Sequence, residues 1–284
     1  MLVDALSVVL RALSFLALFQ AAGIAIFLAF FGRELEASAA GTRKAGVVAA
    51  WIALPLVIGH YALEPARMAG ELAGMMDATY RGMVTDSSLS AVLALRVLGL
   101  ALVLIGLRPQ SAKAIGIIGA ALVAVSFAFM GHTTTHANRW LLEAMLLVHL
   151  LVVAFWFGAL LPLYRISAQE PAEVAGRIVD EFSRRAIWLV PGLFVAGVIL
   201  AASILPSVAS LSTTYGELVL TKVGGFSVLL ILATLNKWTY GPALAKSDLA
   251  AGRGFRRAVL AEYVIIAAVL CVTAVMTTFY SPDE

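Results

Sequence analysis

The sequence predicts an all-α, polytopic membrane protein with about eight transmembrane helices, and three observations lead to this class. Hydrophobic residues make up 62% of the 284-residue chain, whereas charged residues make up only 13%. The mean hydropathy of +0.97 is too high for a soluble fold, which must cover itself with polar surface. The apolar runs are about 20 residues long and do not alternate in polarity, so they fit helices that cross a bilayer rather than strands of a membrane barrel.

Eight apolar segments can be drawn, and we expect them to form one integral-membrane domain over residues 1–284. The first segment is read as a span and not as a cleavable signal peptide, because no Lys or Arg precedes it and it is far longer than a signal core. The longest connections, at 67–87, 165–185 and 237–256, are expected to hold no separate soluble domain. The predicted spans are 5–31, 46–66, 88–107, 112–131, 139–164, 186–205, 216–236 and 257–280.

The basic residues are sorted by side, and this sorting predicts the orientation. The loops after the first, third, fifth and seventh spans hold 14 of the 20 Lys and Arg residues, whereas the opposite loops hold three. Because basic loops stay inside, both termini are expected outside. The same sorting explains the net charge of +3, so a nucleic-acid partner is not expected. The outer face is net negative and would concentrate cations, although the positive-inside rule alone would produce a similar asymmetry.

Three cations fall within the outer halves of spans one, three and seven. The simpler interpretation is that their side chains snorkel to the outer headgroups. The alternative is that they pair with acids to brace an outer cavity. The cations are Arg11, Arg96 and Lys222, and the candidate partners are Glu64, Glu143 and Glu217.

The stretch 129–163 carries three of the four histidines. His132 and His136 occupy a polar gap between two apolar segments. His149 lies about ten residues inside the second segment, roughly 15 Å deep, which is near the middle of a hydrocarbon core of about 30 Å. A metal-competent group at this depth is a functional-site hypothesis.

The methionines favour a soft metal. Apart from Met1, all seven lie in the outer half of the predicted bundle or in outer loops, on the same side as the histidines. Thioether and imidazole groups together suit copper, particularly Cu(I). The lone cysteine, Cys271, excludes an internal disulfide and a cysteine-cluster metal site. A single Met in an apolar helix is more often filler and a single buried His more often structural, but seven clustered methionines are harder to explain in this way.

Helical spacing selects the candidate ligands. His60, Glu64 and Met68 share one face if the helix continues past Pro65. In span five Met145 and His149 lie on one stripe, which also carries Val153 and Trp156; near the inner interface Trp156 reads most simply as an aromatic-belt residue. The candidate metal ligands are His60, Met130, His132, His136, Met145 and His149.

Two familiar chemistries do not fit the sequence. The run from His132 to His136 lacks the glutamate of a zinc-protease helix, and its three threonines disfavour a helix. No nucleotide-binding loop or phosphorylation motif occurs, so ATP-driven pumping is not expected.

Several residues and short motifs in the second half of the chain carry a resemblance to a known family. They are His149, Trp156-Phe157-Gly158-Ala159-Leu160, Phe182-Ser183-Arg184-Arg185-Ala186, Thr214 to Lys222, Asn236 and Glu262. With these residues the chain resembles the copper resistance D family of bacterial inner-membrane proteins. The resemblance covers most of the chain and is densest from about Gly131 onward, where one departure is Gly158-Ala159 in place of the frequent Gly-Gly. It implies eight spans, an inner-membrane location, copper import from the periplasm and a periplasmic copper-binding protein as partner.

These observations predict a copper-permeation or copper-delivery protein rather than an enzyme. Met130, His132 and His136 would form a mouth site, and His60, Met145 and His149 would continue the path inward. Two alternatives remain open. His60 and His149 could ligate a b-type haem in a redox protein, although His60 lies several residues shallower. The protein could also be a copper sensor or scaffold without transport.

Overall fold

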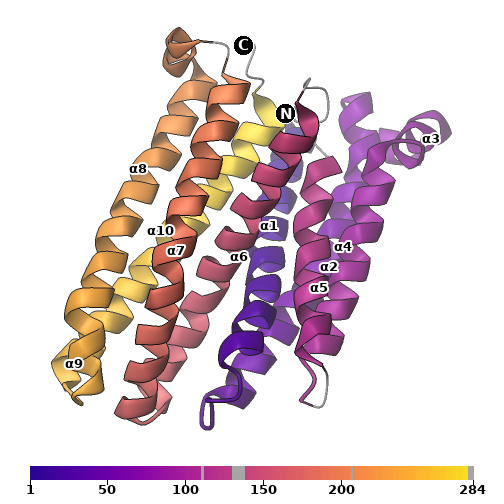
Figure 1. Ribbon diagram of the computed structural model, residues 1–284. Helices are drawn as coiled ribbons and strands as arrows, with labels where there is room; N and C mark the ends of the chain where they lie inside the picture. The colour runs from indigo at the N-terminus through magenta and orange to yellow at the C-terminus, as the bar shows by residue number, and fades with distance from the viewer. Residues whose placement is uncertain (110–111, 130–137, 206, 281–284) are drawn as a thin grey trace.

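The computed structural model describes residues 1–109, 112–129, 138–205 and 207–280, which form a bundle of long helices (Figure 1). No β-strand occurs within these ranges. Within these ranges seven helices are long and apolar enough to cross a membrane, and the fourth predicted span, 112–131, is present as a shorter apolar helix over Lys113–Phe129. The prediction of an all-α polytopic membrane protein is therefore confirmed. The seven are α1 (Leu2–Phe31), α2 (Ala39–Ala69), α4 (Ser88–Gly106), α6 (Arg139–Gln169), α7 (Ala172–Ile204), α8 (Thr214–Leu235), which continues through η5 and α9, and α10 (Leu249–Phe279).

The two ends of the chain lie at the same end of the bundle. In Figure 1 the start of α1 and the last turn of α10 are together at the top, while the α1–α2 and α6–α7 connections and α9 (Gly241–Ala245) are at the bottom. This arrangement agrees with an even number of crossings. The bottom end carries the basic connections, so we refer to it as the inner end and to the opposite end as the outer end; this assignment stays a prediction from charge.

The predicted connections are more helical than expected. The connection after α2 contains η1 (Leu72–Met76) and α3 (Ala78–Thr85), and the fourth predicted span is formed by α5 (Lys113–Val125) and η2 (Ser126–Phe129). The sixth predicted span, 186–205, is the later part of α7, which begins earlier, at Ala172. Its first four turns are amphipathic, with Ile178 and Phe182 buried and ion pairs from Asp180 to Arg184 and from Glu181 to Arg185. Such a stripe stabilises a helix outside the bilayer, which an apolar-run criterion does not detect.

The inner connections are joined by one carboxylate. Glu170, which ends α6, accepts hydrogen bonds from the Ser38 hydroxyl at 2.6 Å and from the backbone N–H groups of Glu36, Ala37 and Ser38 at 3.2, 3.4 and 2.8 Å. Because Ser38 is the N-cap residue of α2, this cluster fixes the α1–α2 connection against the end of α6.

The centre of the bundle is α1, packed against α2, α5, α6 and α10. Leu18, Ile24 and Phe27 on this helix are fully buried, as expected for a helix that is apolar on every face. At its crossing with α6, a Cβ atom placed on Gly158 would lie 2.2 Å from the Cα atom of Gly23. The two backbones therefore touch, as helices in membranes do where small residues face each other.

Candidate membrane-embedded site

The six candidate ligands are divided by the structure. Met130, His132 and His136 lie outside the described residues. His60 is on α2, and Met145 and His149 are on α6. Of the histidines, the structure therefore describes His60 and His149, whose imidazole rings lie in separate environments.

His60 belongs to a buried polar cluster near the outer end of the bundle. Arg11 on α1 donates from Nε to His60 Nε2 at 3.2 Å and from Nη1 to the Thr277 carbonyl of α10 at 2.6 Å. Glu64 Oε1 lies 3.8 Å from Arg11 Nη2 and 3.6 Å from His60 Nε2, and Arg67 binds both oxygens of Glu64 at 3.0 and 3.1 Å. Arg11, His60 and Glu64 are each at most 7% exposed. The cluster joins α1, α2 and α10, and within it His60 Nε2 accepts a hydrogen bond from the Arg11 guanidinium.

The shared face that the sequence predicts on α2 is only partly present. The helix continues past Pro65 to Ala69, so His60 and Glu64 do lie one turn apart and are buried together. Met68 instead faces outward and is 50% exposed. We conclude that the buried polar face of α2 ends near Glu64.

The embedded cations do not behave alike. Snorkelling is the wrong interpretation for Arg11 and Arg96, which are 7% and 5% exposed. Arg96 Nε donates to Ser126 Oγ at 3.2 Å, and its guanidinium stacks 4.6 Å above the Phe127 ring. The alternative pairing of Arg11 with Glu64 is confirmed. Lys222 is partly exposed, and no ion pair joins it to Glu217 in the part of the chain that the structure describes.

His149 has a simpler environment between α6 and α7. Its Nδ1 atom lies 3.4 Å from the Leu193 carbonyl oxygen, and because a carbonyl oxygen only accepts, Nδ1 carries the hydrogen. The imidazole packs beside Gly197, where a Cβ atom would lie 3.5 Å from its Cε1 atom, an ordinary van der Waals contact. Nε2 is then the unprotonated nitrogen. Histidine ligands of metals commonly have this arrangement, with the second nitrogen donating to a carbonyl or carboxylate.

A complete metal-binding set is not present among the described residues, in which no group of three or more His, Cys, Asp or Glu side chains could hold an ion. A haem shared by His60 and His149 is not favoured either. At Nε2 of His60 it would have to displace the hydrogen bond from Arg11.

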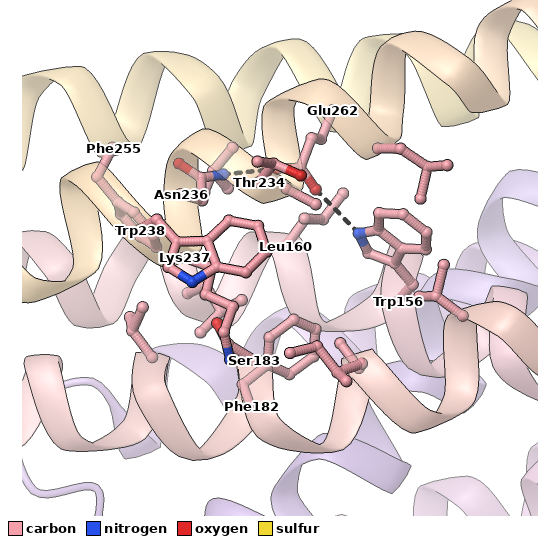
Figure 2. A pocket seen from close by; sticks show the side chains of 18 of the residues that line it. Trp156, Leu160, Phe182, Ser183, Thr234, Asn236, Lys237, Trp238, Phe255 and Glu262 are labelled. Atoms are coloured by element: carbon pink, nitrogen blue, oxygen red, sulfur yellow. Dashed lines mark hydrogen bonds between the residues drawn. The ribbon is translucent and has the colours of Figure 1, made fainter.

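A cavity of about 230 Å³ lies further toward the inner end, between α6, α7, α8 and α10 (Figure 2). Glu262 of α10 projects into its polar end and accepts a hydrogen bond at each oxygen, from Trp156 Nε1 at 2.9 Å and from Asn236 Nδ2 at 2.5 Å. These three side chains are only 3%, 4% and 7% exposed. Asn236 Oδ1 is buried and has no hydrogen-bond partner among the described residues.

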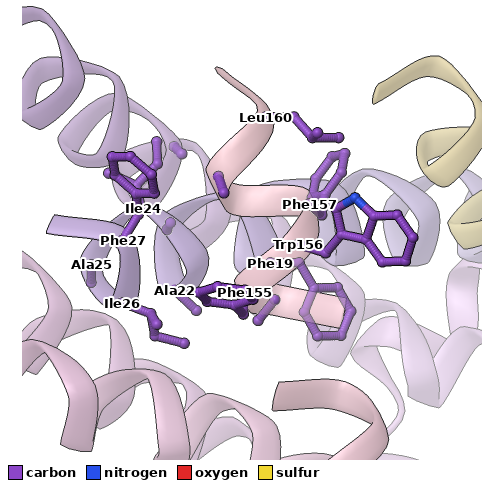
Figure 3. Close-up of a cluster of buried hydrophobic side chains, with 14 of the residues drawn as sticks. Phe19, Ala22, Ile24, Ala25, Ile26, Phe27, Phe155, Trp156, Phe157 and Leu160 are labelled. Carbon is purple, nitrogen blue, oxygen red and sulfur yellow. The ribbon is translucent and has the colours of Figure 1, made fainter. Parts of the chain in front are cut away.

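The aromatic-belt interpretation of Trp156 is therefore wrong, because its ring lies inside the bundle. Figure 3 shows it at the edge of an apolar cluster formed by α1 and α6, beside Phe155 and Phe157. This cluster fixes the indole, so that its N–H is directed at Glu262. Trp156 lies seven residues beyond His149 on the same helix, a rise of about 10 Å toward the inner end.

Asn236 is positioned by a break in the regular helix. It begins η5, the π-helical turn Asn236–Tyr240, which is followed by Gly241 and Pro242. Proline lacks the N–H needed to continue the α-helical ladder, and single π turns occur often at functional sites. The sequence contained a signal for this site only through the resemblance, which named Trp156, Asn236 and Glu262 without indicating that they meet.

Two family models match the chain. The model for copper resistance protein D matches residues 176–276, and the model for the copper resistance protein D-like N-terminal domain matches residues 1–139. Together they cover most of the sequence, with His60 in the first range along the chain and Asn236 and Glu262 in the second; His149 lies between the two. No curated protein and no solved structure matches the chain.

Proposed function

Because this chain belongs to the copper resistance D family, we propose that it imports or delivers copper from the periplasm through a His/Met site in the outer half of the helix bundle. Family membership makes it a copper resistance and homeostasis protein, and its long apolar helices make it a multi-pass protein of the inner membrane. The direction of movement, the ligands and the absence of an enzymatic role belong to the proposal.

The single observation that carries the proposal is the state of His149. Its Nδ1–H is held by the Leu193 carbonyl, and its Nε2 makes no hydrogen bond within the described ranges. A soft metal ion needs a neutral imidazole with one free nitrogen at a fixed orientation. Met145 lies one turn nearer the outer end on the same helix and could add a thioether.

His60 is a weaker candidate ligand than His149. Its Nε2 accepts a hydrogen bond from Arg11, and two guanidinium groups lie in the same cluster. A copper ion at this nitrogen would have to displace the guanidinium of Arg11 and approach that of Arg67. Within the proposed path His60 therefore binds copper best when the Arg11 side chain turns away from it. While the hydrogen bond to Arg11 is present, His60 links α1 and α2.

The outer end supplies features suited to collecting the ion. Met75, Met76 and Met83 are exposed in the connection that contains η1 and α3, and exposed acids such as Glu71 lie nearby in the chain. Exposed thioethers can take Cu(I) from a periplasmic copper-binding protein, which is the partner we propose. The proposed mouth residues Met130, His132 and His136 would receive the ion next.

The test is the substitution His149→Gln, which retains similar size and hydrogen-bonding capacity but removes the imidazole nitrogen. We expect normal amounts of folded membrane protein and copper binding weakened by about tenfold or more, measured by elemental analysis of purified protein and by titration with Cu(I). His132→Gln and His136→Gln should each have a smaller effect, because water or a neighbouring ligand can compensate at the wetter mouth. Full copper binding and full activity in His149→Gln would return His149 to a structural role.

A further inference from the structure

We infer that Glu262 is a proton-binding site, which exchanges its proton with water at the inner end through the neighbouring cavity and releases it more readily when copper is bound at His149. The link to copper rests on the proposed function and deepens it, since a proton leaves the bundle as the metal cation enters. No redox change is involved: the O–H bond of the carboxyl group breaks, its proton passes to a cavity water, and the copper ion keeps its charge.

Glu262 has no counter-ion among the residues that the structure describes. It is 3% exposed, and both of its hydrogen-bond donors, Trp156 and Asn236, are neutral. No described Lys, Arg or His forms an ion pair with it. A carboxylate buried in this way is costly, and a bound proton removes the charge together with the cost. The surroundings therefore suit a carboxyl group that carries a proton.

The charged groups of the helices around Glu262 leave the carboxyl unpaired. Within the described ranges the cavity lining from α6, α7 and α8 contains no acid, Lys, Arg or His, so Lys237 of η5 is the one charged side chain that shares the cavity with Glu262. Arg185 of α7 stacks on two phenylalanine rings of α1 at 4.8 and 5.3 Å. Arg256 of α10 donates to a carbonyl of α6 at 3.1 Å, and Arg11 of α1 is bonded near the outer end of α10.

Asn236 can serve Glu262 in either protonation state. In the structure its Nδ2 donates to Glu262 Oε1 at 2.5 Å, while its Oδ1 is buried without a partner among the described residues. A half turn of the amide would bring Oδ1 to the carboxyl, where it can accept the O–H of the protonated form. A separation of 2.5 Å is typical of O–H···O bonds and short for N–H···O bonds. Trp156 can donate to the other oxygen in both states, so the proton can leave and return without breaking the network.

The cavity offers the proton a route to the inner end. Its volume of about 230 Å³ has room for several water molecules. The hydroxyls of Ser183 and Thr234 and the amine of Lys237 are in its lining, and Figure 2 shows them on the same side of the bundle as Asn236. Trp238, which also lines it, is 66% exposed. Hydrogen-bonded water among these groups can carry a proton between Glu262 and the inner surface.

Copper bound at His149 favours the ionised form of Glu262. Trp156, the hydrogen-bond donor to Glu262, lies roughly 10 Å from His149 along α6. At an effective dielectric constant of about 20, unit charges at roughly this distance change each other's binding by about tenfold. The effect is reciprocal, so copper weakens proton binding at Glu262, and the ionised carboxylate strengthens copper binding.

Infrared spectroscopy of the purified protein tests the proton itself. We expect the carbonyl stretching band of a protonated carboxyl group at neutral pH, lost at higher pH, absent from Glu262→Gln and displaced in Glu262→Asp. Glutamine keeps the size of the side chain and its bond from Trp156. The wild-type band should shift in D2O, because cavity water reaches the carboxyl. Asp180→Asn, an exposed change on α7, is the matched control and should keep the band.

The absence of such a band from the wild type, or its retention in Glu262→Gln, would overturn the proton site. A Glu262 band that persists at every pH and does not shift in D2O would mean a sealed, structural carboxyl group and would overturn the exchange.

Proton release on copper binding tests the link. Cu(I) is added anaerobically, as its acetonitrile complex, to weakly buffered protein with a pH indicator. His149 Nε2 is already unprotonated, so its occupation by copper releases no proton. At the pH where the Glu262 band is half lost, the wild type should release about half a proton per bound ion, and Glu262→Gln should release none. Cu(I) binding should strengthen by about tenfold across this pH range in the wild type alone.

Equal proton release from the wild type and a copper-binding Glu262→Gln protein would overturn the link. If the wild type binds no Cu(I), the proposed function fails and the link fails with it, whereas the infrared result alone still decides whether Glu262 exchanges a proton.

Discussion

At the scale of one residue, Glu170 makes the inner connections sensitive to pH. Burial raises the pKa of this carboxyl, but hydrogen bonds from the Ser38 hydroxyl and from three backbone N–H groups lower it by more, so the net pKa lies below its ordinary value of 4.5. A group with a lowered pKa stabilises the fold fully above its unfolded pKa, and this stabilisation is lost as the pH falls through the folded value.

We therefore predict that Glu170→Gln lowers the free energy of unfolding by about 1 kcal/mol at neutral pH, since Glu170 is partly exposed and its hydrogen bonds are partly screened by solvent. The difference from the wild type should disappear as the pH falls below 4.5. Thermal unfolding of both proteins across this range measures it. Glu36→Gln, which alters an exposed side chain of the same connection, should show no such pH-dependent difference. A gap between Glu170→Gln and wild type that persists in acid would contradict the assignment.

Sequence spacing predicts residue pairs only when they share a helix. It placed His60 and Glu64 one turn apart, and the structure agrees. It could not show that Arg11, 49 residues from His60, turns inward, because a transmembrane helix is apolar on both its lipid face and its packed face. For the same reason the sequence could not show that the Trp156 side chain points into the bundle.

At the scale of the helix pair, Gly158 sets the distance between α1 and α6. We predict that Gly158→Ala destabilises the protein by about 1–3 kcal/mol, because the added methyl group meets the backbone of Gly23 and the helices must separate. Gly192→Ala is the matched control: nothing lies within 4 Å of its Cβ position, so only the helix propensity improves, by up to about 1 kcal/mol. Melting temperatures in detergent compare the two. Equal behaviour of both variants would mean that α1 and α6 can move apart freely.

The helices themselves were predictable to within a few residues where a span is bounded by loops, as for 88–107 against Ser88–Gly106. They were not predictable where a helix continues outside the bilayer, as in α7 from Ala172, because hydropathy alone marks only the buried portion. The π turn at Asn236 depends on how Pro242 is accommodated, and no periodicity in the sequence indicates it.

At the scale of the whole molecule, the charge asymmetry predicts that both termini are periplasmic. A reporter that is active only in the periplasm should be active when fused to the C-terminus and inactive when inserted in the α6–α7 connection. The C-terminal fusion and the insertion serve as controls for each other, because Figure 1 places the end of α10 and the α6–α7 connection at opposite ends of the bundle. Activity of a strictly cytoplasmic reporter at the C-terminus would reverse the orientation and place Glu262, rather than His149, nearer the outside.

The fold class followed from composition, whereas the cavity did not. Its walls come from α6, α7, α8 and α10, which lie far apart in the sequence, and two of them, α6 and α10, pack against α1. The sequence alone shows that Asn236 and Glu262 are polar residues in two separate apolar segments. Only the assembled bundle shows that they share a hydrogen bond with each other and a common cavity.

The position of α1 has a consequence for how the protein is made. Among the described helices long enough to span, α1 is made before the others and is also the most enclosed, with 78% of its apolar window buried, against 44% or less for each of the rest. Its buried face is therefore uncovered until its neighbours are synthesised, and the charge of Arg11 has no partner from α2 until His60 and Glu64 follow. The bond from Arg11 to Thr277 can form only after α10 is made. These helices thus assemble around the one that is made earliest among them.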